Sequence, residues 1–120
     1  MSRFCLILEP VPLVARDLAA TAHENLRFEP LLAKSEAEAL SMVESLDAAA
    51  RLSLAFVHST AANFASSALR PLLEGRGTKI ILLGAEPGAD WPVLVSPFST
   101  EQVLDLVASI DRLAQRPAAG

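Results

Sequence analysis

Cysteine is almost absent from this chain of 120 residues, which contains Cys5 alone. A single cysteine cannot form an internal disulfide, so a hydrophobic core has to hold the fold, and a reducing compartment is expected. Cys5 stands inside an apolar run and is expected to be a small buried side chain rather than a reactive thiol. We expect a cytoplasmic protein, because the first residues lack the basic start and cleavage site of a signal peptide.

Basic side chains and long apolar runs are scarce as well. Ten Lys and Arg stand against 14 Asp and Glu, the formal net charge is −4, and the basic residues are scattered along the sequence. This balance disfavours a nucleic-acid partner, because such binding depends on clustered Lys and Arg. No apolar run reaches the ~20 residues that a membrane-spanning helix requires. We therefore expect neither nucleic acid nor a membrane as a partner.

Material for a core is plentiful, since 52% of the residues are hydrophobic and the mean hydropathy is +0.38. The length suits one domain, expected at residues 1–115, with a flexible tail at 116–120. Apolar runs typical of strands alternate with segments of helical periodicity. The strands are expected at 4–8, 28–33, 53–58, 79–83 and 92–95, and the helices at 12–26, 36–50, about 61–72 and about 100–114. This alternation predicts an α/β fold of three layers, with a parallel sheet covered on both faces.

Three features mark the expected helix boundaries. Ser35 with Glu38, and Ser99 with Gln102, have the spacing of capping boxes at helix starts. Pro71 is expected to kink or restart the third helix, because proline lacks the backbone donor that a helix interior needs.

The connection between the last two strands is unusually short. Only eight residues, 84–91, separate the strand at 79–83 from the strand at 92–95, whereas a parallel crossover normally contains a helix. Fully extended, they span about 27 Å, which is enough to run back along a strand of about 17 Å. We therefore expect a parallel last strand with the fourth helix missing or reduced. An antiparallel strand in a wide hairpin is the alternative.

The chain resembles a response-regulator receiver domain, the phosphorylation module of two-component signalling, over about residues 3–115. The likeness rests on the order and spacing of four segments: Leu6–Glu9 followed by Pro12–Val14, the strand ending at His58, Gly88–Asp90, and Val95–Phe98. It implies a flavodoxin-like fold with five parallel strands in the order 2-1-3-4-5. The ends of strands one and three then lie side by side at the topological switch point.

The resemblance also implies a phosphorylation site, and this sequence departs from it. The family has an acidic pair after strand one, a phospho-acceptor aspartate after strand three, a hydroxyl residue after strand four and a lysine after strand five. Here Glu9 is followed by Pro10, and the other positions hold His58, Gly84 and Ser96. Mg²⁺ favours several hard oxygen ligands, and phosphoryl transfer depends on metal and cation together. The sequence therefore predicts a pseudo-receiver without catalytic residues, metal or cofactor, acting as a phosphorylation-independent protein-interaction module.

His58 leaves other interpretations open. It is a candidate phospho-accepting histidine, metal ligand or general base, and with Glu9 and Ser96 it would form a pocket for a small ligand or an enzymatic reaction. The simpler expectation is that His58 fills a vestigial pocket and hydrogen-bonds Glu9 or the backbone. Ser59 and Thr60 are more readily explained as helix caps than as nucleophiles.

Trp91 is the only tryptophan and stands in the short connection. We expect it either to cover the sheet edge that a missing helix leaves bare or to anchor a protein partner, since tryptophan is enriched in interface hot spots. Together with Phe98 and the last helix, it is expected to form an apolar surface. That surface would bind another signalling protein or a second copy of the chain, giving a homodimer through the strand-five and helix-five face.

Overall fold

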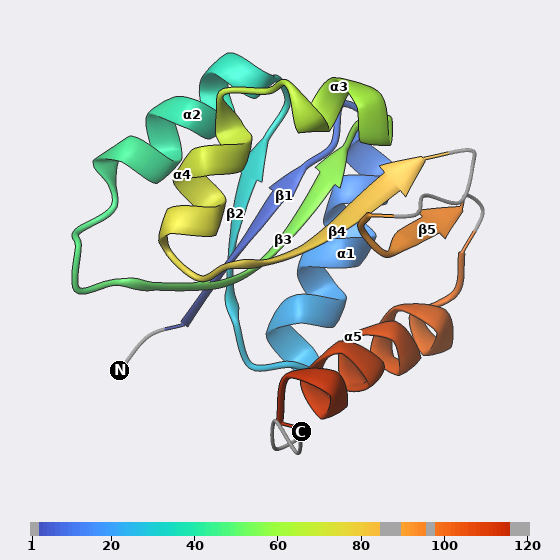
Figure 1. Cartoon of the computed structure of the whole chain (residues 1–120). Helices are drawn as coiled ribbons and strands as arrows, with labels where there is room; N and C mark the ends of the chain where they lie inside the picture. Colours follow the sequence, from blue (N-terminus) through green and yellow to red (C-terminus); the bar gives the residue numbers. More distant parts are fainter. Residues whose placement is uncertain (1–2, 85–89, 96–97, 116–120) are drawn as a thin grey trace.

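The computed structural model describes residues 3–84, 90–95 and 98–115, with side chains up to Ile110 in the last helix (Figure 1). The strands are β1 (Arg3–Leu8), β2 (Glu29–Ala33), β3 (Arg51–His58), β4 (Lys79–Gly84) and β5 (Val93–Val95). The helices are α1 (Pro12–Glu24), α2 (Glu36–Ser45), α3 (Ala61–Ala65), α4 (Leu69–Gly75) and α5 (Thr100–Gln115). The expected tail at 116–120 lies outside the described residues.

The five strands form one parallel sheet in the order β2-β1-β3-β4-β5, which confirms the predicted topology. β5 pairs with β4 in parallel register, with Leu82 opposite Val93 and Gly84 opposite Val95. The antiparallel alternative is therefore wrong. No helix lies between β4 and β5 within residues 90–92, and the preceding residues 85–89 are not described.

Successive side chains along each strand point to opposite faces of the sheet and form two hydrophobic layers. Leu6 and Leu8 of β1 join the cluster under α2, α3 and α4, whereas Cys5 and Ile7 join the cluster under α1 and α5. Figure 1 shows these two groups of helices on opposite faces of the sheet. Cys5 is fully buried, and burial raises the pKa of its thiol to about 12. The thiol therefore stays neutral and unreactive in the folded protein, in line with the prediction of a structural cysteine.

Both predicted helix starts are capped in the structure. The backbone N–H of Glu38 donates to Ser35 Oγ over 3.2 Å at the start of α2. At α5 the bonds are reciprocal: Gln102 N–H donates to Ser99 Oγ over 3.2 Å, and Ser99 N–H donates to Gln102 Oε1 over 2.7 Å. These caps satisfy donors that have no partner within the first turn of a helix.

The third predicted helix is two helices, α3 and α4, separated by residues 66–68. Ser67 Oγ accepts a hydrogen bond from Leu69 N–H over 3.0 Å, a local bond that competes with helix continuation. Pro71 then falls in the first turn of α4, where a missing backbone donor costs nothing. The second helix is shorter than expected and ends at Ser45, because Asp47 Oδ1 accepts from Ala49 N–H in a following turn. Within the described part of the chain, none of the helices is long and apolar enough to cross a bilayer.

Gly77 ends α4 in a conformation that favours glycine. Its φ is 71°, its N–H donates to the Glu74 carbonyl, and the Thr78 N–H donates to the Leu73 carbonyl, both over 3.0 Å. This pair of bonds is a Schellman motif, in which the residue with positive φ is usually glycine.

Two glycine substitutions are expected to change stability in opposite directions. Gly77→Ala should lower the free energy of unfolding by about 1 kcal/mol, because a Cβ disfavours the left-handed conformation. Gly75→Ala should raise it by up to about 1 kcal/mol, because Gly75 lies in the helix and a Cβ there meets nothing within 4 Å. Urea denaturation followed by circular dichroism measures both values. Effects of the same sign would contradict this account of the turn.

Candidate functional site

The carboxyl ends of β1, β3 and β4 meet at one edge of the sheet, which we call the carboxyl edge. Glu9 follows β1, His58 ends β3 and Gly84 ends β4. All three line one cavity of about 240 Å³, together with apolar residues that include Phe98. The structure therefore brings together three of the positions that the sequence predicted. Ser96 lies outside the described residues.

The Glu9 side chain is turned toward the start of α1. Glu9 is only 5% exposed, and its Oε2 accepts a hydrogen bond from Val11 N–H over 3.0 Å. Val11 is the N-cap of α1 and has no side chain that caps a helix. A carboxylate at this place satisfies a backbone donor and interacts favourably with the helix dipole. One oxygen of Glu9 is thus committed to starting α1.

His58 behaves differently from the simplest expectation. Its side chain is exposed, and within the described part of the chain it makes no hydrogen bond, neither to Glu9 nor to the backbone. The imidazole lines the cavity with Glu9 and also a wider cavity of about 1030 Å³ that extends toward α3. An exposed imidazole without a partner is not held in one tautomer or orientation, as a general base would be.

The hydroxyl groups after β3 form hydrogen bonds with backbone groups. Thr60 Oγ1 accepts from Asn63 N–H over 3.1 Å and caps α3, as the sequence predicted. Ser59 Oγ donates to the Thr60 carbonyl over 2.9 Å. Neither hydroxyl has a hydrogen bond to a basic side chain among the described residues, so neither is activated as a nucleophile.

The magnesium ion that a receiver-like fold implies does not fit these residues. Pro10 offers no side-chain ligand, and one Glu9 oxygen is already bonded to Val11 N–H. Glu36 and His58 both line the wider cavity. Across the described ranges, however, no group of three or more His, Cys, Asp or Glu side chains is placed to hold a metal ion. Mg²⁺ prefers an octahedral set of oxygen ligands, and imidazole is a poor substitute.

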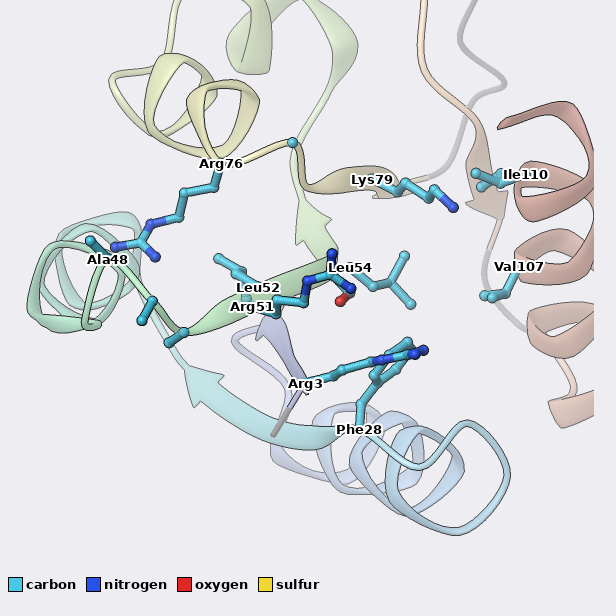
Figure 2. A pocket seen from close by; sticks show the side chains of 14 residues that line it. Arg3, Phe28, Ala48, Arg51, Leu52, Leu54, Arg76, Lys79, Val107 and Ile110 are labelled. Carbon is cyan, nitrogen blue, oxygen red and sulfur yellow. The ribbon is translucent and has the colours of Figure 1, made fainter. Parts of the chain in front are cut away.

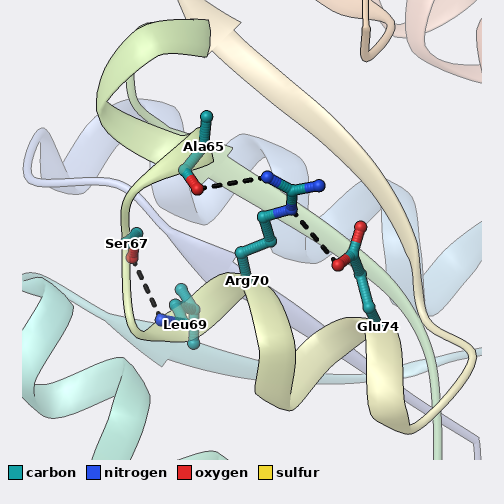
Figure 3. A network of polar contacts seen from close by, with 5 residues as sticks. All are labelled: Ala65, Ser67, Leu69, Arg70 and Glu74. Carbon is teal, nitrogen blue, oxygen red and sulfur yellow. Dashed lines mark hydrogen bonds and ion pairs between the residues drawn. The ribbon is translucent and has the colours of Figure 1, made fainter.

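Trp91 is half-buried and packs against the helices on the α2–α4 face. Its ring meets the edge of Phe64 with centroids 5.0 Å apart and planes at 89°, and the Arg70 guanidinium lies 5.2 Å from its centroid. Arg70 also donates to the Ala65 carbonyl and to Glu74 Oε1 (Figure 3). These contacts place Trp91 against α3 and α4, and its expected role in covering the sheet edge stays a prediction.

The apolar surface expected from Trp91, Phe98 and the last helix is not continuous. Trp91 belongs to the cluster on the α2–α4 face, whereas Phe98 packs in the cluster of α1 and α5 on the opposite face of the sheet. The two side chains are close in sequence, but β5 lies between them and they pack on opposite sides of it. A partner that binds both rings would have to wrap around the edge of the sheet.

Sequence reasoning missed a cluster of basic residues at the other edge of the sheet, where the strands begin. Four of the ten Lys and Arg line one cavity there: Arg3, Arg51, Arg76 and Lys79 (Figure 2). Three of these are the first residues of β1, β3 and β4. A basic residue at the first position of three strands could have predicted this cluster from the sequence, because parallel strands all begin at the same edge of a sheet. The basic residues are scattered in the sequence but gathered in the fold.

No family model matches the sequence, and no curated protein matches it. Solved structures do match the fold. SdrG from Sphingomonas melonis Fr1 is 22% identical, with 91% of this chain and 96% of that chain covered and a TM-score of 0.69. The receiver domain of the PhyR response regulator from Erythrobacter litoralis is 18% identical, with 99% and 97% covered and a TM-score of 0.69. Chemotaxis protein CheY4 from Vibrio cholerae is 15% identical, with 92% and 98% covered and a TM-score of 0.67. These likenesses define the class of the fold, which is that of response-regulator receiver domains.

Proposed function

We propose that the chain is a signalling module that acts through contact with a protein partner and does not depend on aspartyl phosphorylation. The observation that carries this proposal is the hydrogen bond from Val11 N–H to Glu9 Oε2, over 3.0 Å, at the carboxyl edge of a receiver-type sheet. It ties the acidic residue after β1 to helix capping. His58 and Gly84 stand at the ends of the next two strands, where the family resemblance implies an aspartate and a hydroxyl group.

The charges at this edge support the proposal. Transfer of a phosphoryl group depends on cations that neutralise its oxygens and on a nucleophile held in line. The cavity lined by Glu9 and His58 is otherwise mostly apolar, and none of the described residues that line it is Lys or Arg. The fold offers the surfaces of a receiver domain for protein contact, while the described lining of the cavity between Glu9 and His58 supplies no cation for phosphoryl chemistry. A non-enzymatic role follows from the same residues.

Titration with phosphoryl-group mimics tests this proposal. Addition of Mg²⁺ with beryllofluoride, or with acetyl phosphate, is expected to leave the backbone amide NMR signals of Glu9, His58 and Gly84 unchanged. A receiver domain that carries the acceptor aspartate serves as the positive control, and Mg²⁺ alone serves as the blank. Saturable shifts centred on His58, or a gain of one phosphate in the intact mass, would overturn the proposal.

A small-ligand or enzymatic pocket is the second candidate, and one observation favours it. Glu9 and His58 line the same cavity. Its volume of about 240 Å³ is below the range of about 300–1,000 Å³ usual for ligand pockets, however. Glu9 also points its bonded oxygen toward α1. This candidate predicts that His58→Ala abolishes binding of a ligand that shifts the NMR signals of both residues.

Self-association through β5 and α5 is a separate part of the proposal. β5 is an edge strand of three residues, and its Val95 is 41% exposed. An unpaired strand edge with an exposed apolar side chain is a ready surface for a second chain. The weight-average mass in analytical ultracentrifugation is expected to rise with concentration, and Val95→Glu should suppress the rise. A monomer mass at every concentration would remove this part of the proposal and leave the first part standing.

A further inference from the structure

The cavity at the edge where the strands begin has the charge and shape of a binding site. Its volume is about 590 Å³, within the range of about 300–1,000 Å³ typical of ligand pockets. Arg3 and Lys79 extend into the space between the strand ends and α5, and Val107 and Ile110 point back toward them (Figure 2). The cavity lies at the opposite edge of the sheet from Glu9 and His58, so the absence of phosphorylation at the carboxyl edge has no bearing on it.

Two arginines are placed side by side, and the described residues that line the cavity around them include no acid. Arg3 of β1 and Arg51 of β3 are register partners on neighbouring strands, and both are exposed. Like charges in such positions repel each other and destabilise a sheet. In the described part of the chain neither side chain makes an ion pair or hydrogen bond, and none of the residues that line the cavity is acidic. The two guanidinium groups are therefore available to an anion from outside the chain.

The other two basic residues, Arg76 and Lys79, already have polar partners and contribute to the walls of the cavity. The Arg76 guanidinium donates to the carbonyls of Val43, Leu46 and Asp47 at the end of α2, over 2.9–3.3 Å. It therefore builds one wall of the cavity. Lys79 has a polar contact of its own, and it adds positive charge near the cavity without being required for binding.

The opposite wall is apolar. It is formed by the half-buried ring of Phe28, before β2, and by Val107 and Ile110 of α5. A ligand that fills the cavity therefore needs an anionic end for the arginines and an apolar body for this wall. Arginine presents a planar fork that pairs two donors with phosphate or carboxylate oxygens. Two arginines carry a charge of +2, which matches the multiple negative charge of a phosphate or diphosphate group better than that of a single carboxylate.

We propose that this cavity binds a small organic phosphate, with its phosphate group between Arg3 and Arg51 and its apolar body against Phe28 and α5. Three probes separate the parts of this proposal. ADP carries both phosphate and a flat ring, inorganic pyrophosphate carries the anion alone, and adenosine carries the ring alone. In isothermal titration calorimetry ADP is expected to bind with one-to-one stoichiometry, pyrophosphate about tenfold more weakly, and adenosine not measurably.

Matched charge variants locate the site. Arg3→Gln and Arg51→Gln are each expected to weaken ADP binding by about tenfold or more, because each removes charge-assisted hydrogen bonds to the phosphate. Arg16→Gln removes the same charge from an exposed position on α1, away from the cavity, and should leave binding unchanged. Without ligand, Arg51→Gln should melt at the same or a slightly higher temperature than the parent chain, because the repulsion with Arg3 is relieved.

Three results would overturn the proposal. The first is the absence of saturable binding of ADP or pyrophosphate at millimolar concentration in low salt. The second is an equal loss of affinity in Arg16→Gln, which would show attraction to net charge alone. The third is binding of an acidic peptide that depends on Arg3 and Arg51 while ADP does not bind, which would assign this surface to a protein. None of these results depends on the outcome of the beryllofluoride titration at the carboxyl edge.

Discussion

Replacement of Phe64 by alanine is expected to lower the free energy of unfolding by about 4 kcal/mol, a large part of the 5–15 kcal/mol typical of a domain. Phe64 is 1% exposed and is the one buried residue of α3. A helix of five residues is not stable by itself, so α3 keeps its place through this contact with the core. The edge-to-face contact with Trp91 adds about 1 kcal/mol, and alanine removes it as well.

Trp91 reports this change directly, because it is the only tryptophan. In Phe64→Ala the native emission should shift to longer wavelength, since the indole loses the ring that covers its face and meets water. Phe64→Leu is the matched control: it keeps most of the buried volume and should cost only about 1.5 kcal/mol or less, with a small emission shift. Urea denaturation followed by fluorescence and by circular dichroism gives both quantities. A native emission unchanged in Phe64→Ala would contradict the packing of Trp91 on α3.

The sheet could be predicted from the sequence because its signals are local. Each strand is an apolar run bounded by polar or turn-forming residues, and Ser35 and Ser99 mark two helix starts through bonds within four residues. The parallel last strand followed from a length argument, since residues 84–91 are too few for a helical crossover but sufficient for an extended one. These inferences needed no knowledge of contacts between distant residues.

The break between α3 and α4 depends on a competition that periodicity does not reveal. Apolar residues continue at helical spacing through residues 61–72, so the pattern predicts one helix. The Ser67 side chain offers the Leu69 N–H a closer partner, and the chain turns there instead. Arg27 is a comparable case, because it adopts a φ of 61° after α1 although it is not glycine. The Phe28 N–H then donates to the Ala22 carbonyl over 2.9 Å, and this tertiary setting overrides the intrinsic preference.

The candidate site was predicted in its positions but not in its contacts. Glu9, His58 and Gly84 do meet at the carboxyl edge, because strand order decides which ends are neighbours. Which partner the Glu9 carboxylate takes depends on Val11 lacking a capping side chain, a detail of the following turn. The gathering of Arg3 and Arg51 was missed for a similar reason. Positions 48 residues apart become neighbours only once the β1–β3 register is known.

Replacement of Arg76 by alanine is expected to lower the free energy of unfolding by about 2–3 kcal/mol, more than is usual for a surface arginine. Arg76 is half-buried, and its guanidinium donates to the carbonyls of Val43, Leu46 and Asp47 at the end of α2. The Val43 and Asp47 carbonyls also accept from backbone N–H groups, so Arg76 matters most for the Leu46 carbonyl. A cation at a helix C-terminus also interacts favourably with the helix dipole. Loss of this side chain leaves the Leu46 carbonyl to be satisfied by water, removes the second bond of the other two carbonyls and loosens α2 from α4.

Arg16→Ala is the matched control, because it removes the same side chain from an exposed position on α1. A surface substitution of this kind is expected to change the free energy of unfolding by about 0.5 kcal/mol or less. Arg76→Lys should fall between parent and alanine, because a compact ammonium lacks the planar fork whose spaced donors reach three carbonyls at once. Equal losses in Arg16→Ala and Arg76→Ala would show that the α2 carbonyls do not need Arg76. In that case the hydrogen bonds to α2 would not be what holds Arg76 in the cavity wall. Its guanidinium would then be available to bind an anion together with Arg3 and Arg51.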